Sequence, residues 1–211
     1  MLIMINGKRG NSNNIFLQKY KNRSCCSPNQ GLSPVVALLD ADYSEVQQSA
    51  LTCIARCARN SENISAFVEM GVMEKLIAFV SIKENRASYV FALNALSAIL
   101  QEPGAVARLA LVPPPSKGSE PAPAPLSLLV SFVSNSDEAV QISALSCIAN
   151  ACSNAASRSV LLEFKAEAAL VARLLSEDAK APFTPALTIA SARAVAAICK
   201  GRVRCRAASL S

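Results

Sequence analysis

Apolar residues recur along most of this chain at the three- and four-residue spacing of helices that bury one face. One such series is made by Val46, Ala50, Cys53, Ile54 and Cys57. It predicts an amphipathic helix from about residue 44 to about residue 59. No segment of the sequence alternates apolar and polar residues for long enough to predict a strand. The pattern therefore predicts an all-α fold.

Capping residues predict where the next helices begin and end. Asn60 is suited to begin a helix over residues 60–70, and Gly71 is suited to end it in a left-handed conformation. A further helix is expected over residues 72–80. These two helices and a third of the kind predicted at residues 44–59 make up one unit of three helices.

A last helix is expected near the C-terminus. Thr184 is suited to cap it, and Pro185 fits its first turn because the missing N–H of proline is not needed there. Gly201 is expected to end this helix.

The sequence repeats itself at an offset of 94 residues. Residues 33–80 align with residues 127–174 without a gap, and the best block pairs VQQSALTCIA at 46–55 with VQISALSCIA at 140–149. A weaker copy begins a step of 42 residues after the first. A period near 42 residues is typical of helical repeat arrays.

This period predicts four units, at residues 33–59, 60–101, 104–153 and 154–201. The first unit lacks an opening helix. The third is longer because it contains PPPSKGSEPAPAP at 113–125, which we interpret as a surface linker between helices. We expect one repeat array over residues 31–201, a disordered basic arm at 1–30 and a basic tail at 202–211.

Two segments carry a family resemblance. NSENISAFVEMGVMEKLIAFV at 60–80 resembles the first and second helices of an armadillo (ARM) repeat, and SEVQQSALTCIARCA at 44–58 resembles the third. The resemblance implies a right-handed superhelical solenoid of about four three-helix repeats, with the third helices along a concave groove. It also implies a scaffold that binds a protein partner in that groove, and no catalysis.

The resemblance places specific residues in the groove. Import adaptors of the family carry a Trp and, four residues later, an Asn on the third helices, and these clamp an extended basic peptide. The Trp positions here are Thr52, Asn94, Ser146 and Arg193, and the Asn positions are Arg56, Ala98, Asn150 and Ala197. Without Trp the shelves for lysine side chains are absent, and Arg56 would repel a basic ligand.

The same positions also lack the dense row of Lys and Arg that groove binders of acidic peptides carry. We therefore expect a mildly polar groove that binds a peptide or a helix of a protein partner. Its residues would be Gln48, Thr52, Arg56, Asn94, Ser146, Asn150 and Arg193. The alternative is that these are simply exposed residues of the third helices.

The net charge of +6 is concentrated at the two ends. Residues 1–30 carry +5 and residues 200–211 carry +4, which leaves −3 for the residues between them. Either these ends are solvated and disordered, or they bind nucleic acid or an anionic surface electrostatically. The second possibility is the alternative to a protein-binding groove.

The sequence contains no credible export signal and no run of the roughly 20 apolar residues that a membrane helix needs. Eight cysteines without an export signal indicate reduced thiols. We expect an intracellular protein, in the cytoplasm, with the nucleus and the cytoskeleton or cilia as alternatives.

No set of residues predicts catalysis. The chain contains no His, the commonest general base, and its scattered glycines form no phosphate-binding loop. Cys53 and Cys147 occupy equivalent positions in two units, which indicates small buried apolar residues. Cys25 and Cys26 have no second pair at zinc-binding spacing. We expect no enzymatic activity, no cofactor and no metal.

Stacked repeats bury their faces against neighbours, so both ends of the array are expected to expose apolar residues. These residues would be Val35, Val36, Leu38 and Leu39 at the front and Val195, Ile198 and Cys199 at the back. We therefore expect the chain to be able to associate with itself through its ends.

Overall fold

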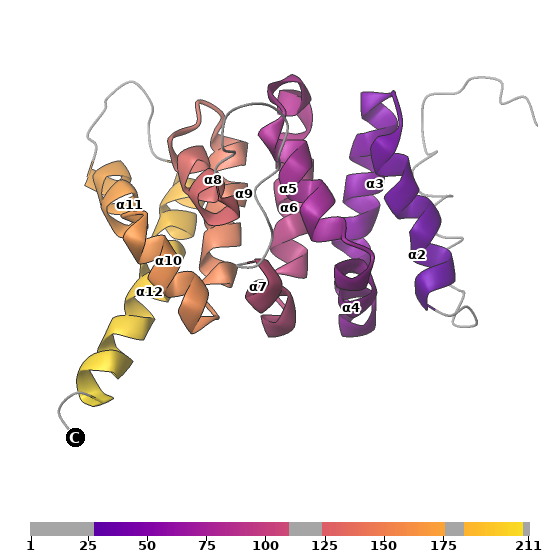
Figure 1. Ribbon diagram of the computed structural model, residues 1–211. Helices are drawn as coiled ribbons and strands as arrows, with labels where there is room; N and C mark the ends of the chain where they lie inside the picture. Colours follow the sequence, from indigo (N-terminus) through magenta and orange to yellow (C-terminus); the bar gives the residue numbers. More distant parts are fainter. Residues whose placement is uncertain (1–27, 110–123, 176–183, 209–211) are drawn as a thin grey trace, which may run out of the picture.

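The computed structural model describes residues 28–109, 124–175 and 184–208, and these residues form α-helices and short 3-10 helices without any strand (Figure 1). The predicted all-α fold is confirmed. The α-helices are α2 (Pro28–Ala37), α3 (Ser44–Cys57), α4 (Ser61–Glu69), α5 (Val72–Ser81), α6 (Tyr89–Ile99), α7 (Pro103–Leu109), α8 (Pro125–Ser131), α9 (Glu138–Ala151), α10 (Ala155–Glu163), α11 (Ala166–Leu175) and α12 (Pro185–Ala208). The 3-10 helices are η1 (Leu38–Asp40), η2 (Lys83–Ser88) and η3 (Phe132–Ser134).

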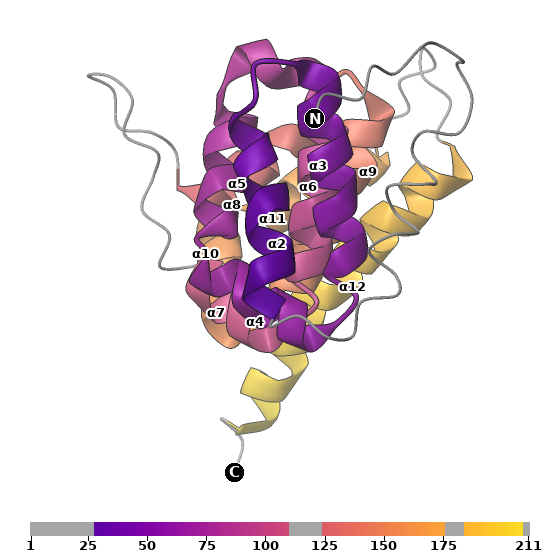
Figure 2. The same ribbon diagram turned by 90° about the vertical axis from the view of Figure 1, so that its right-hand side faces the viewer.

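The helices stack in three sets, which Figure 2 shows from the end formed by α2 and α3. The third helices of the four units, α3, α6, α9 and α12, form one row in which each contacts the next. The second helices are α2, α5, α8 and α11, and the first helices are α4, α7 and α10. The described residues therefore form an all-α solenoid, in which each unit packs mainly on its neighbours along the chain.

The predicted caps are present. Asn60 Oδ1 accepts a hydrogen bond of 2.9 Å from the backbone N–H of Glu62, and Asn154 caps α10 in the same way. Gly71, between α4 and α5, has a φ of 70°, the left-handed conformation expected of it. The Thr184 hydroxyl oxygen accepts from the backbone N–H of Leu187 at the start of α12. Local capping chemistry thus sets these helix ends.

Helix α12 continues through Gly201 to Ala208, so the prediction that Gly201 ends it is wrong. A glycine inside a helix costs only about 1 kcal/mol relative to alanine. The residues that follow, RVRCRAA, are mostly good helix formers, which explains why one glycine does not stop the helix. The insertion at 113–125 lies outside the described residues except for its last two positions.

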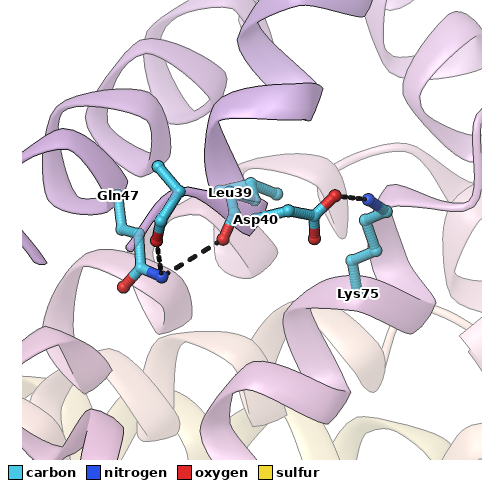
Figure 3. A network of polar contacts seen from close by, with 5 residues as sticks. Leu39, Asp40, Gln47 and Lys75 are labelled. Carbon is cyan, nitrogen blue, oxygen red and sulfur yellow. Dashed lines mark hydrogen bonds and ion pairs between the residues drawn. The ribbon is translucent and has the colours of Figure 1, made fainter. Parts of the chain in front are cut away.

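The turns before α3 and α9 are each held by a glutamine, and the two glutamines are related by the 94-residue offset. Gln47 Nε2 donates to the carbonyl oxygens of Leu39, at 3.3 Å, and Ala41, at 2.7 Å (Figure 3). Its equivalent, Gln141, donates to the carbonyl of Asn135 in the corresponding turn. The same turn in the first unit is joined to α5 by an ion pair of 2.6 Å between Asp40 and Lys75.

Cysteines are part of the core, as predicted. Cys53 is 8% exposed and Cys147 is fully buried. The Cys147 thiol donates to the carbonyl oxygen of Leu93 on α6 at 3.2 Å, and burial raises its pKa far above the ordinary range. A small side chain at this position allows two third helices to pack closely.

The predicted exposure of the front end is wrong for three of its four residues. Val35, Val36 and Leu39 are buried because α2 begins at Pro28 and packs its apolar side on α3 and α4; Leu38 alone is 38% exposed. At the other end Ile198 is buried as well and Val195 is half-buried, whereas Cys199 is exposed as expected. The large apolar residues that are exposed in the described part of the chain are Leu38, Tyr43, Phe164, Val171 and Ile189.

Among the described helices, none has both the length and the apolar character that a membrane crossing requires.

Candidate functional site

All seven residues predicted to form the groove come from the row of third helices. They are Gln48, Thr52 and Arg56 on α3, Asn94 on α6, Ser146 and Asn150 on α9, and Arg193 on α12. Arg56, Asn94 and Arg193 are exposed, and the other four are half-buried. The structure thus places them on consecutive, contacting helices, and we refer to the surface that they form as the third-helix surface.

On the first helix of this surface, the polar side chains are partly used for internal hydrogen bonds. Gln48 Nε2 donates to the hydroxyl of Ser88, which directly precedes α6, at 3.1 Å. The Thr52 hydroxyl donates to the carbonyl of Gln48, one turn earlier in its own helix. Arg56 is exposed in the last turn of α3, where a cation is favourable next to the helix dipole.

Between α6 and α9 two asparagines link neighbouring units. The Ser143 hydroxyl donates to Asn94 Oδ1 at 2.9 Å. Asn150 Nδ2 donates to the carbonyl oxygen of Ser97 at 2.8 Å and lies 3.2 Å from the Ser97 hydroxyl. The side-chain nitrogen of Asn150 is therefore engaged inside the solenoid, which leaves mainly its oxygen for a ligand.

The third-helix surface is hollowed where α6, α9 and α12 meet. A pocket of about 310 Å³ lies there, with polar walls made by Gln101, Asn150, Ser153 and Lys200. Leu100, Ala149, Cys152 and Ala197 provide its apolar part. Of these eight residues only Asn150 was among the predicted groove residues.

Sequence reasoning missed Gln101, Ser153 and Lys200 for a geometric reason. The family pattern concerns only two positions in the middle of each third helix. Gln101 and Ser153 instead follow the last turns of α6 and α9, and Lys200 lies further along α12. The signal available in the sequence was that three neighbouring units each place a polar residue at or just after the end of the third helix.

The charged residues among those that form this surface and line its pocket are cations. Arg56, Arg193 and Lys200 are exposed, and the two ion pairs found among the described residues, Lys75 with Asp40 and Arg108 with Glu74, involve none of them. Behind the pocket wall, Arg158 of α10 donates to the carbonyl oxygens of Cys152 and Ser153. The carbonyl groups at the end of α9 are thereby partly neutralised.

The described residues contain no cluster of three or more His, Cys, Asp or Glu side chains that could hold a metal ion. Cys25 and Cys26 lie outside the described residues. Among the thiols of the described residues, that of Cys57, which is half-buried on α3, is more acidic than an ordinary thiol. A hydrogen bond with the Cys53 thiol, one turn earlier, lowers the pKa of Cys57 to about 7, while the pKa of Cys53 is raised.

Several solved structures with a similar arrangement of helices are designed or engineered proteins. A designed armadillo repeat protein in complex with the peptide (KR)4 is 26% identical and has a TM-score of 0.66 over 80% of this chain and 64% of that chain. Computationally designed armadillo repeat proteins for modular peptide recognition give 26% identity and a TM-score of 0.65 over 82% and 66%. An engineered protein gives 23% identity and a TM-score of 0.67 over 82% and 64%.

This chain therefore has an armadillo-type repeat fold, and it spans somewhat less than two thirds of the length of these designed proteins. No protein-family model and no curated protein matches the sequence.

Proposed function

We propose that this armadillo-type solenoid is a protein-interaction scaffold that binds a segment of a partner protein along its third-helix surface and has no catalytic role. The observation that carries the proposal is the alignment of the polar side chains of four units on contacting helices α3, α6, α9 and α12. A linear surface of this kind suits a linear ligand, because each unit can contact a successive part of it.

Two of the similar solved structures support this proposal. One designed armadillo repeat protein is in complex with a peptide, and another design was made for modular peptide recognition. What those proteins bind does not define the partner of this chain, which has its own side chains at the third-helix surface. A cytoplasmic location and a peptide or helix as the bound element remain predictions.

The length of the surface sets the size of the ligand. Packed helices lie about 8–10 Å apart, so four third helices span roughly 24–30 Å. An extended chain covers about 3.3–3.6 Å per residue, so a segment of roughly seven to nine residues reaches from α3 to α12.

The proposal can be tested by placing a large uncharged side chain on one set of helices at a time. Thr52→Tyr and Ser146→Tyr place a large ring on the third helices α3 and α9. Ser65→Tyr and Ser159→Tyr place the same ring at exposed, equivalent positions of the first helices α4 and α10. The full-length chain and these four variants are used to capture proteins from an extract of the source cells, and the captured proteins are quantified by mass spectrometry.

We expect a set of captured proteins that is lost with both third-helix variants and retained with both first-helix variants. Circular dichroism of each variant establishes that the helices are intact. Identical capture by all four variants and the unaltered chain would show that partners bind elsewhere.

A further inference from the structure

The third-helix surface differs in charge from what a basic ligand requires. At the end of this surface that holds the pocket, the exposed charged residues Arg193 and Lys200 of α12 are cations; at the other end, α3 exposes both Arg56 and Glu45. None of the eight residues that line its pocket is acidic. The similar designed protein with 26% identity is in complex with (KR)4, a peptide made entirely of cations. Such a peptide would meet like charges on the surface of this chain.

The pocket has the groups that recognise a carboxylate. Lys200 supplies an ammonium group at its wall, and Ser153 and Gln101 add a hydroxyl and an amide that can donate hydrogen bonds. A hydrogen bond between an ammonium group and a carboxylate is stronger than one between neutral groups. The apolar part of the wall, which includes Leu100 and Ala197, suits the methylene groups of a glutamate side chain.

The main electrostatic objection to an anion in this place is the end of α9. The last carbonyl groups of a helix carry partial negative charge and would repel a carboxylate. Here the guanidinium group of Arg158 donates to the two carbonyls that directly follow α9, on Cys152 and Ser153. The carbonyl of Ser97 on α6 is likewise occupied, by Asn150. The repulsion is thereby reduced, and Arg158 adds a second positive charge behind the wall.

We propose that the third-helix surface binds an acidic extended segment, one carboxylate of which occupies the pocket between α6, α9 and α12 and pairs with Lys200. This inference rests on the proposed function, because it names the chemistry of the partner for the same surface. Further carboxylates of the segment would pair with Arg193, on the same helix as Lys200, and with Arg56, at the other end of the row on α3.

The test compares three labelled peptides of equal length, (DE)4, (KR)4 and (SN)4, by fluorescence anisotropy with the full-length chain at low and high salt. Lys200→Gln removes the cation of the pocket and keeps a side chain of similar length. Lys165→Gln is the matched control, because it removes the same charge from an exposed position between α10 and α11.

We expect (DE)4 to bind most tightly and to weaken as salt is raised, since exposed charge pairs are screened. Lys200→Gln should weaken (DE)4 by about tenfold, the size expected for loss of one hydrogen bond to a charged group. Lys165→Gln should leave the affinity unchanged.

Three results would overturn the proposal that the ligand is an acidic segment. They are tighter binding of (KR)4 or (SN)4, an equal loss of affinity with both Gln variants, and no binding of any of the three peptides. The proposed function is judged separately. The scaffold function would be supported without an acidic ligand by either of two results. One is a peptide of another charge whose binding is lost with Ser146→Tyr, and the other is a set of cellular partners that is lost with the third-helix variants.

Discussion

The side-chain nitrogen of Asn150 on α9 lies 2.8 Å from the carbonyl oxygen of Ser97 on α6, in the preceding unit. The residue that the family resemblance places in a ligand-binding position therefore also joins two repeats. In the first unit the equivalent position is Arg56, which is exposed and has no such partner among the described residues. One sequence position thus serves a structural purpose in one unit and presents a charge in another.

Asn150→Ala should destabilise the chain by about 1 kcal/mol, the usual net value of a hydrogen bond between neutral groups. Urea unfolding followed by circular dichroism measures the change. Ser146→Ala is the control, because the Ser146 hydroxyl donates only to the Ile142 carbonyl of its own helix, at 2.9 Å. We expect the control to be close to neutral. Equal losses for the two variants would contradict a role of Asn150 between units.

Lys165→Gly should stabilise the chain. Lys165 has a φ of 53° in the turn between α10 and α11, where the equivalent residue 94 positions earlier is Gly71 with a φ of 70°. A left-handed conformation costs a residue with a side chain roughly 1–2 kcal/mol. Glycine removes this cost but has more entropy to lose on folding, so the net gain should be about 0.5–1 kcal/mol.

Thermal unfolding of Lys165→Gly and of the reverse change, Gly71→Lys, measures the effect. Gly71→Lys should be destabilised, because it places a residue with a side chain in the left-handed conformation that glycine adopts there without strain. A lower midpoint of thermal unfolding for Lys165→Gly would contradict this prediction. It would show that the contacts of the Lys165 side chain stabilise the fold by more than its left-handed backbone conformation costs.

Cys147→Asp should destabilise the chain by several kcal/mol, because the side chain is fully buried between α6 and α9 and a carboxylate there would have no cation to pair with. Cys147→Ala should cost much less, since only one sulfur atom is removed. Cys53→Asp, at the equivalent position of the first unit, should cost less than Cys147→Asp because Cys53 is 8% exposed and has no preceding third helix against it in the described residues. Melting temperatures of the four proteins rank these effects.

Cys57 should be alkylated more readily at neutral pH than an ordinary thiol. Its pKa is lowered to about 7 by the hydrogen bond with Cys53, so its reactive thiolate is half formed near pH 7 and dominates above it. The rate of its reaction with iodoacetamide, followed by mass spectrometry of the peptides, should rise with a midpoint near pH 7. Cys53→Ala should move that midpoint upward. Cys152, whose pKa burial raises to about 12, should stay unreactive throughout and serves as an internal control.

Much of the fold follows from the sequence because each repeat carries the same local signals. The 94-residue offset pairs Gln47 with Gln141 and Asn60 with Asn154, and both members of each pair make the same hydrogen bonds. The pocket could not be predicted in this way. Its position depends on how far α12 extends beside α9, and the expected stop at Gly201 gave no reason to connect Lys200 with Asn150.

The burial of the apolar residues at the start of the first unit also could not be predicted from the sequence pattern. Val35 and Val36 lie beside Pro34, which made a helix there hard to predict. In the structure Pro34 lies within α2, and the helix buries both valines. Tertiary packing of an apolar face outweighed the local cost of the proline.

The start of α12 provides a last test, because one hydroxyl group there makes two contacts. The Thr184 hydroxyl donates to Glu138 Oε1 at the start of α9, and the same oxygen accepts from the backbone N–H of Leu187, 3.3 Å away. Thr184→Ala removes both contacts. It should cost about 1–2 kcal/mol, since a lost helix cap alone typically costs about 1 kcal/mol and a hydrogen bond to a charged group contributes more than a neutral one.

Thr184→Ser keeps the hydroxyl and removes only the methyl group, so it should retain most of the stability. Glu138→Ala removes the contact between units but leaves the cap. If Thr184 acts in both ways, the double variant Thr184→Ala/Glu138→Ala should be less destabilised than the sum of the two single variants, because the bond that they share is counted once. Simple additivity in urea unfolding, with Thr184→Ala no worse than Thr184→Ser, would mean that neither the cap nor the link between α9 and α12 stabilises the solenoid.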